Sequence, residues 1–200
     1  DRDCSSCHED AAPITDQMSL CSDCHDLEDS EGAGKIVHAP FEDGECSECH
    51  NPHAGRSDPL IATETLVAAC AECHDTDDLM PVPELAHTPV RDGRCADCHR
   101  PHSSEHGGLL TAAAGEICWT CHDTMKAMQS MRHVHEPFAD GDCGGCHSPH
   151  GTDQPMTLLD APSVLCAECH DTEDADLIRT HRNFPLAETD CSGCHSPHAS

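Results

Sequence analysis

The chain has 200 residues, of which 38 are acidic and 10 are basic, so its formal net charge is −28 when histidine is neutral. Nucleic acids and anionic membrane surfaces are excluded as favourable partners, because like charges repel. Aromatic residues make up 2% of the chain, and few apolar side chains with a high net charge are otherwise typical of disorder.

Along the chain, the most regular feature is the pentapeptide Cys-x-x-Cys-His, which occurs nine times and contains all 18 cysteines. This pentapeptide is the attachment signature of c-type haem: two thiols bind one porphyrin and the histidine becomes the proximal iron ligand. Zinc ribbons and disulfides also use C-x-x-C pairs, but neither requires a histidine directly after the second cysteine. We therefore expect nine haems of c type.

The expected thioether cysteines are Cys4, Cys7, Cys21, Cys24, Cys46, Cys49, Cys70, Cys73, Cys95, Cys98, Cys118, Cys121, Cys143, Cys146, Cys166, Cys169, Cys191 and Cys194. The expected proximal ligands are His8, His25, His50, His74, His99, His122, His147, His170 and His195.

Nine haems on 200 residues leave roughly 22 residues for each porphyrin, far fewer than a side-chain core requires. The macrocycles would supply the missing apolar core. The expected fold class is a multihaem cytochrome c of mostly irregular loops, with a few short helices, little or no sheet and an extended chain of haems as the core.

The motifs form an internal repeat of two types. In the first type an aspartate follows the motif, and in the second type the chain continues as Cys-His-x-Pro-His. The first cysteines of each type step by 49, 48 and 48 residues, and the second type follows the first by 25 residues. The expected organisation is one continuous structure with a single-haem segment and four two-haem modules, at residues 1–20, 21–69, 70–117, 118–165 and 166–200.

Secondary structure should be sparse between the motifs. The aspartate after each first-type motif favours the start of a short helix, and proline-rich connections favour loops. Met125, Met128 and Met131 have the spacing of one short amphipathic helix.

Ten histidines lie outside the motifs, and eight of them stand in register with the repeat. One set follows a proximal histidine by three residues: His53, His102, His150 and His198. The other set precedes a second-type motif by eight or ten residues: His38, His87, His135 and His181. Recurrence favours distal iron ligation, because imidazole is a common axial ligand of haem iron. We expect the first set to ligate a neighbouring haem and the second set to reach over the haem that follows.

The haem on Cys4 has no ligand of its own in this register, because Ala11 stands where the second-type histidine would be. His106, His133, a histidine of another subunit or a methionine are the candidates for that iron.

The recurring text from His38 through Cys46, Cys49 and His50 to Pro52-His53, followed by Cys70 to His74, resembles the doubled-CXXCH multihaem cytochromes. The resemblance spans residues 21–200. Relatives include porin-bound decahaem conduits and subunits of extracellular cytochrome filaments. The resemblance implies bis-histidine haems in contact that pass electrons along the chain.

Electron transfer is therefore the favoured function, and no enzymatic activity is expected. The chain would act in extracellular electron transfer as a filament subunit. The alternatives are a monomeric periplasmic shuttle, a porin-bound conduit and, more remotely, a reductase with an open site at the Cys4 haem.

Export is expected, because c-type haem is attached outside the cytoplasmic membrane, and we expect a mature chain whose signal peptide has been removed. No apolar stretch is long enough for a membrane span. The expected partners are other redox proteins, metal-oxide acceptors and further copies of the chain. Divalent cations could bind the acidic clusters Glu28-Asp29, Asp75 with Asp77-Asp78, and Asp171 with Glu173-Asp174, although a helix start explains them as well.

Overall fold

The computed structural model describes residues 4–9, 12–13, 16–27, 34–187 and 189–200. These residues form two compact units. The first unit contains residues 1–75 and 92–113, and the second contains residues 76–91 and 114–200. Each unit is therefore built from two separate stretches of the chain. The expected modules of about 48 residues remain a prediction from the spacing.

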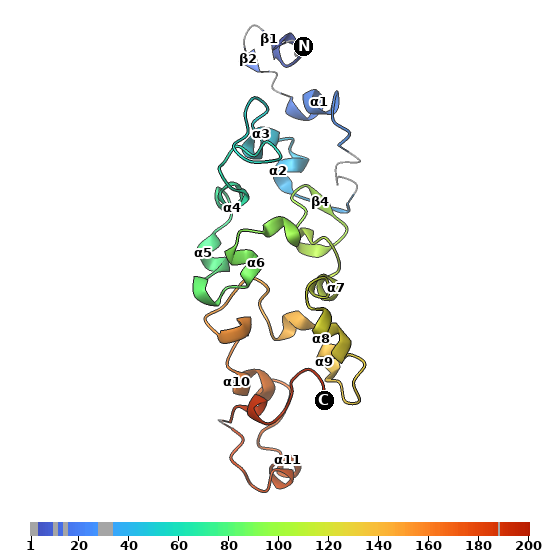
Figure 1. The fold of residues 1–200 in the computed structure, drawn as a ribbon, viewed down its shortest axis with the longest axis vertical. Helices are drawn as coiled ribbons and strands as arrows, with labels where there is room; N and C mark the ends of the chain where they lie inside the picture. Colours follow the sequence, from blue (N-terminus) through green and yellow to red (C-terminus); the bar gives the residue numbers. More distant parts are fainter. Residues whose placement is uncertain (1–3, 10–11, 14–15, 28–33, 188) are drawn as a thin grey trace. The chain divides into compact units, whose positions relative to one another are not determined.

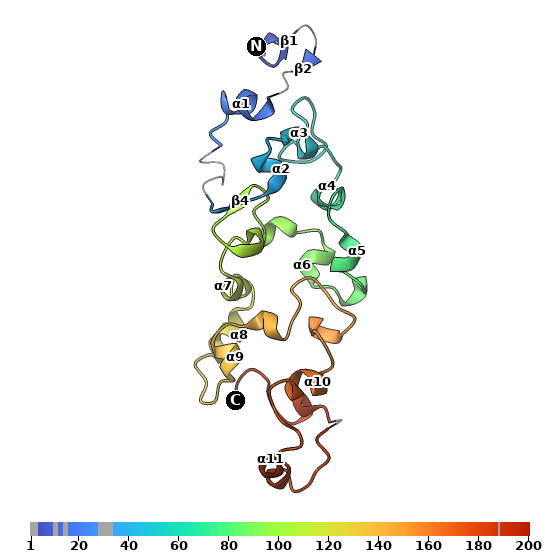
Figure 2. The same ribbon diagram turned by 180° about the vertical axis from the view of Figure 1, so that it is seen from behind.

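The first unit contains short elements separated by long loops (Figure 1). Its α-helices are α1 (Gln17–Ser22), α2 (Ala39–Glu42), α3 (Cys46–Cys49) and α4 (Leu66–Ala71). Its 3₁₀ turns are η1 (Cys4–Ser6), η3 (Cys95–Asp97) and η4 (Gly107–Leu109). Its strands are β1 (His8–Glu9), β2 (Ala12–Pro13), β3 (Ile36–Val37) and β4 (Ser103–Ser104). Helices α2 and α3 lie side by side in both views (Figures 1 and 2).

The second unit has the same character. Its α-helices are α5 (Thr76–Leu79), α6 (Thr88–Arg91), α7 (Ala114–Cys118), α8 (Asp123–Met128), α9 (Glu136–Ala139), α10 (Pro162–Ala167) and α11 (Ala175–Thr180). Its 3₁₀ turns are η2 (Pro83–Leu85), η5 (Cys143–Gly145), η6 (Pro155–Thr157) and η7 (Cys191–Gly193). Helix α8 is shorter than the methionine spacing suggests, because it ends at Met128 and leaves Met131 outside with 43% of its surface exposed.

Two small antiparallel sheets occur in the described part of the chain, and both lie in the first unit. Strand β1 pairs with β2, and β3 pairs with β4 in the register Ile36 to Ser104 and Val37 to Ser103. The second pair joins residues far apart in the sequence, so it sets the position of the loop after the Cys95 motif against the segment before Cys46.

Capping explains where several of the short helices begin. The Asp174 side chain accepts hydrogen bonds from the backbone N–H groups of Asp176 and Leu177 at the start of α11. Thr65 caps α4 in the same way, through the N–H of Ala68. As the sequence predicts, helices begin at or shortly after the aspartate of a first-type motif, for example α8 at Asp123.

A glycine in the left-handed conformation stands two residues before three of the second-type motifs. Gly44, Gly93 and Gly141 have φ angles of 73°, 74° and 75°. Each follows the short helix α2, α6 or α9, where a left-handed residue ends the helix and turns the chain. The turn brings the chain directly into the next Cys-x-x-Cys-His motif.

Few side chains are buried among the described residues. The buried hydrophobic ones are Ile61, Ala86, Phe138 and Ala199. The fold class predicted from the sequence is confirmed: short helices and two-residue strands are embedded in loops. No described helix is long and apolar enough to cross a membrane.

Candidate haem sites

Eight of the nine motifs form a helical turn that places their three reactive side chains on one face. In eight of the nine motifs the N–H of the histidine donates to the carbonyl of the first cysteine, at 2.9–3.0 Å. Residues i, i+3 and i+4 of a helical turn share a face. Two thiols and one imidazole therefore point to the same side, as one porphyrin requires.

The cysteines themselves are consistent with thioether attachment. All 18 are free thiols, and none is joined in a disulfide. Within the described ranges, no three or more His, Cys, Asp or Glu side chains gather as a metal-ion site. The zinc and disulfide alternatives therefore gain no support from the structure.

Most proximal histidines face a second histidine from a distant part of the chain. The ring-centroid distances are 5.7 Å for His8–His53, 6.1 Å for His74–His38, 6.0 Å for His50–His102, 6.1 Å for His122–His87, 6.2 Å for His170–His135, 6.2 Å for His147–His198 and 5.9 Å for His195–His181. The two rings are nearly parallel, within 23°, in all pairs except His50–His102 at 48° and His195–His181 at 64°.

This spacing fits one iron between two imidazoles. An imidazole nitrogen lies about 2 Å from a metal that it binds and about 1 Å from the centre of its own ring, so two rings that share a metal have centroids about 6 Å apart. Rings in direct face-to-face contact would lie closer, at about 3.5–4 Å. The residues present therefore fit a porphyrin held between each pair.

The pairs obey two rules. A second-type histidine faces a proximal histidine 45 to 52 residues earlier, as His102 faces His50. An upstream histidine faces a proximal histidine 35 or 36 residues later, as His38 faces His74. His181 departs from the second rule, because it faces His195 only 14 residues later.

These rules correct two expectations. The upstream histidine His38 faces His74 of the next module and not His50 of the motif that follows it, and His87 and His135 behave alike. Only His181 faces the motif that follows it. The expected source of the Cys4 partner is also different, because His53 lies opposite His8. The expectation assumed that an upstream histidine faces the motif closest to it in the sequence, whereas the folded chain places it opposite the motif after that one.

Hydrogen bonds at the second ring nitrogen orient several of these imidazoles. Nδ1 of three second-type proximal histidines lies close to the carbonyl oxygen nine residues later: His50 to Pro59 at 3.0 Å, His99 to Gly108 at 2.7 Å and His147 to Met156 at 3.0 Å. A carbonyl can only accept, so Nδ1 carries the proton and Nε2 keeps its lone pair. Iron-binding histidines characteristically donate in this way.

The loop that provides these carbonyls returns to pair with its own motif. Isolated antiparallel bridges join His50 to Ile61, His99 to Leu110 and His147 to Leu158. Left-handed residues at the loop tip, Leu60, Gly108 and Met156 among them, turn the backbone. The sequence analysis missed these acceptors, because any residue type can provide a backbone carbonyl. The only signal in the sequence is the constant separation of nine residues between histidine and acceptor.

The histidines expected to be distal ligands are also joined to each other through the backbone. The N–H of His38 donates to the carbonyl of His102 at 2.9 Å. The same bond joins His87 to His150 at 2.8 Å and His135 to His198 at 2.9 Å. Each bond joins histidines that face two different motifs, so displacement of one histidine would disturb the other.

Two phenylalanines pack against second-type histidines. Phe41 lies 4.7 Å from His102 and Phe138 lies 5.0 Å from His198, measured between ring centroids. Trp119 contacts the edge of Phe138 at 5.6 Å. The sequence could have indicated the two phenylalanines by their common position, because each stands three residues after an upstream histidine.

The electrostatic setting of His198 favours its neutral form. Burial lowers the pKa of His198, and the neighbouring imidazoles of His147 and His135 lower it further. A neutral imidazole has the lone pair that an iron ligand needs.

Thiols of successive motifs are neighbours within each unit. Burial raises the pKa of the Cys21 thiol, and the nearby thiols of Cys46 and Cys7 add to the effect. Burial likewise raises the pKa of Cys70, with Cys95 and Cys49 as its neighbours.

The second unit shows the same arrangement, because burial raises the pKa of Cys166 and its neighbours include Cys191 and Cys146. Motifs that follow one another in the sequence are therefore adjacent in space within a unit.

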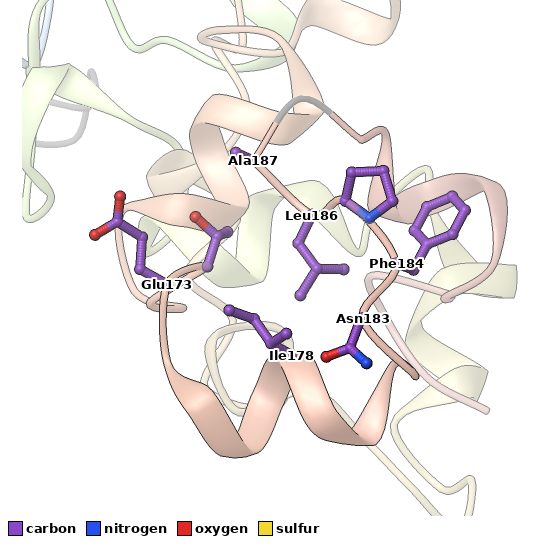
Figure 3. A pocket seen from close by; sticks show the side chains of 8 residues that line it. Glu173, Ile178, Asn183, Phe184, Leu186 and Ala187 are labelled. Atoms are coloured by element: carbon purple, nitrogen blue, oxygen red, sulfur yellow. The ribbon is translucent and has the colours of Figure 1, made fainter.

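A hollow of about 430 Å³ lies beside α11 in the second unit. Ile178 and Leu186 point into it, with Phe184 at its edge (Figure 3). These apolar side chains belong to the stretch of chain on either side of His181.

The remaining predicted residues are placed as follows. Asp171 accepts a hydrogen bond from the Glu173 N–H at 2.9 Å, which together with the Asp174 cap supports the helix-start explanation of this acidic cluster. Glu28 and Asp29 lie outside the described residues. The rings of His106 and His133 belong to none of the histidine pairs within the units; both residues bond through their backbones, His106 to Ser104 and His133 to Ser200.

Comparison with known proteins places the motifs in a family. The family described as "Doubled CXXCH motif" matches this chain three times, at residues 38–79, 87–127 and 135–175, which together exceed half of its length. No curated protein matches the chain. Because the family pattern coincides with the repeat of motifs and facing histidines, this chain belongs to the doubled-CXXCH family of multihaem c-type cytochromes.

Proposed function

We propose that this chain holds nine c-type haems with two histidines on each iron at all or nearly all sites, and that it conducts electrons along them. The observation that carries the proposal is the set of histidine pairs with centroids 5.7 to 6.2 Å apart, each joining a motif histidine to a histidine from another part of the chain. Haem bound in this way supplies reversible one-electron oxidation and reduction.

The order of the motifs supports conduction along the chain. Neighbouring thiols link successive motifs, from Cys7 to Cys21 to Cys46 in the first unit and from Cys146 to Cys166 to Cys191 in the second. Haems attached to neighbouring thiols lie close together, so an electron can pass from each to the next.

Intact mass and spectroscopy test the proposal. The denatured holoprotein should exceed the polypeptide mass by nine covalently bound haems, and the oxidised protein should be predominantly low-spin by electron paramagnetic resonance. A mass near that of the bare polypeptide, or a predominantly high-spin spectrum, would contradict it.

A reductase is the weaker candidate. It requires an open iron position, which the sequence placed at the Cys4 haem, whereas His53 lies opposite His8. Electron transfer without catalysis therefore remains the proposed activity of the paired haems.

We further propose that the chain acts outside the cytoplasmic membrane and assembles into a filament, with other redox proteins or metal oxides as partners. Support comes from the near-constant steps of 49, 48 and 48 residues, which place equivalent groups at regular intervals. The charge of −28 opposes self-association unless cations screen it. Electron microscopy with and without divalent cations tests this, and particles that stay monomeric in both conditions would favour a shuttle or a porin-bound conduit.

A further inference from the structure

Two second-type histidines differ in how their rings are turned, although they stand at equivalent positions of the repeat. His102 faces His50 with an angle of 48° between the ring planes, at a centroid distance of 6.0 Å. His198 faces His147 with an angle of 20°, at 6.2 Å. The separations are nearly equal, so the two pairs differ mainly in how one ring is rotated relative to the other.

The phenylalanine beside each of these second-type histidines is oriented differently as well. Phe41 stacks on His102, with ring planes 28° apart and centroids 4.7 Å apart. Phe138 is tilted by 50° against His198, at 5.0 Å. Both distances lie in the range of favourable aromatic contacts. Rotation of an imidazole about the bond to its Cβ has broad minima, so the ring that packs against it decides where it rests.

Trp119 packs against Phe138 and restrains its ring. The two rings meet edge to face, with planes 89° apart and centroids 5.6 Å apart, an arrangement that aromatic pairs prefer. Gln129 holds the backbone beside the ring, because its Nε2 donates to the carbonyl oxygens of Phe138 and Ala139, both at 3.2 Å. Phe138 is only 8% exposed, so little space remains in which its ring can turn.

The sequence provides this tryptophan in one of the two modules. Trp119 follows the first cysteine of the Cys118 motif and stands 19 residues before Phe138. Ser22 stands at the same distance before Phe41, follows the first cysteine of its own motif and is exposed. Trp119 is the only tryptophan in the chain. One aromatic side chain therefore accompanies the difference between the two pairs of rings.

We propose that Trp119 is a positioning residue for the haem of the Cys143 motif. Through Phe138 it holds the ring of His198 nearly parallel to that of His147. The inference rests on the proposed binding of two histidines to each iron, and it does not depend on conduction or on assembly. All of these residues belong to the second unit.

The angle between two axial imidazoles changes the electronic structure of the iron that they share. Each ring donates π electron density to the iron d orbital perpendicular to its plane. Parallel rings act on the same d orbital and separate it in energy from its partner, whereas crossed rings act on both orbitals and bring them closer together. A smaller separation raises the largest g value of oxidised low-spin iron. The His147–His198 and His50–His102 pairs should therefore give different signals.

Electron paramagnetic resonance of the oxidised holoprotein tests the proposal. Trp119→Ser introduces the residue that stands at the equivalent position of the first module. One haem should change to a signal with a larger greatest g value, and the difference spectrum should integrate to a single haem. Trp119→Phe retains an aromatic edge beside Phe138, so it should keep most of the original signal. An unchanged spectrum of Trp119→Ser, with the full number of haems by intact mass, would overturn the inference.

A second variant decides the question if Trp119→Ser binds fewer haems. Phe138→Leu keeps an apolar side chain beside His198 but removes the ring through which Trp119 acts, so it should produce the same change of signal. Phe41→Leu is the matched control in the first unit, and it should leave the signal of the Cys143 haem unchanged. Identical difference spectra for Phe138→Leu and Phe41→Leu, or no change in Phe138→Leu, would contradict the positioning role.

Failure of the proposed function would look different from failure of this inference. If two histidines do not bind each iron, the wild type is itself predominantly high-spin before any substitution is made. If they do, the wild type is low-spin and only the response to Trp119→Ser and Phe138→Leu is in question. The spectrum of the unmodified holoprotein therefore separates the two outcomes.

Discussion

The Cys21 motif of the first unit and the Cys191 motif of the second differ in how they obtain a facing histidine. His195 faces His181, which comes from only 14 residues earlier in the same stretch of chain. His25 has no facing ring among the described residues. The other paired motifs take their facing histidines from other modules, so each of them depends on a neighbouring module for that ring. The C-terminal motif avoids this dependence by using a local histidine.

The sequence around His181 differs from that around the other upstream histidines. His38, His87 and His135 are followed within two residues by proline, and a short helix α2, α6 or α9 begins there. His181 instead ends α11, and its Nδ1 donates to the carbonyl of Leu177 at 2.9 Å. A histidine at the end of a helix is oriented by that helix. His181 can therefore face a histidine of its own module without the backbone bond to a second-type histidine that His38, His87 and His135 make.

The largest effect should come from removing an interior haem. Replacing Cys166 and Cys169 by Ala should cost one haem and expose His135, whose N–H is bonded to the carbonyl of His198. Replacing Cys21 and Cys24 by Ala should also cost one haem, but among the described residues no histidine ring faces His25 and would become exposed. Limited proteolysis should therefore be much faster for the Cys166/Cys169 variant, and equal rates would contradict the linked-ligand arrangement.

Replacing His181 by Ala should remove the ring that faces His195. The variant should bind one additional carbon monoxide molecule when reduced and show one additional high-spin haem when oxidised. Exogenous imidazole should restore the low-spin spectrum, because it can occupy the position of the lost ring. His133→Ala is the control, and the same gain in that variant would refute the His181–His195 assignment.

Three phenylalanines should differ in how much they stabilise the protein, in the order of their burial. Phe138→Ala should destabilise the protein by about 3–5 kcal/mol, the usual cost of a deleted buried aromatic ring. Phe138 is 8% exposed and contacts both His198 and Trp119.

Phe41→Ala should cost less than Phe138→Ala, because Phe41 is only partly buried. Phe184→Ala should have little effect, because Phe184 is 55% exposed. Urea denaturation monitored by haem absorbance gives the order, and a larger loss for Phe184→Ala than for Phe138→Ala would contradict it.

The smallest effect should come from the ion pair on α11. Arg179 and Asp176 lie 2.9 Å apart, but both side chains are more than three-quarters exposed. Arg179→Gln should change the free energy of unfolding by no more than about 0.5 kcal/mol and should leave the His181 ligation unchanged. A new high-spin haem in this variant would show that the ion pair positions His181.

The sequence by itself determined the register of the repeat, and it predicted haem attachment and the proximal histidines. Thioether formation needs five consecutive residues, and a helical turn is enough to place Cys46, Cys49 and His50 on one face. Such local chemistry can be predicted because it does not depend on where the rest of the chain goes. The sparse secondary structure also followed from composition, since so few apolar side chains cannot build long packed elements.

Only the tertiary structure decided which histidines face each other. His102 and His38 stand in register, yet nothing in their spacing shows that His102 faces His50 while His38 passes over that motif to face His74. Strands β3 and β4 and the backbone bond between His38 and His102 set this pairing, and they join residues more than 60 positions apart. His53 likewise lies opposite His8, 45 positions earlier in the sequence, because a pair of rings assembled from distant segments depends on the path of the folded chain.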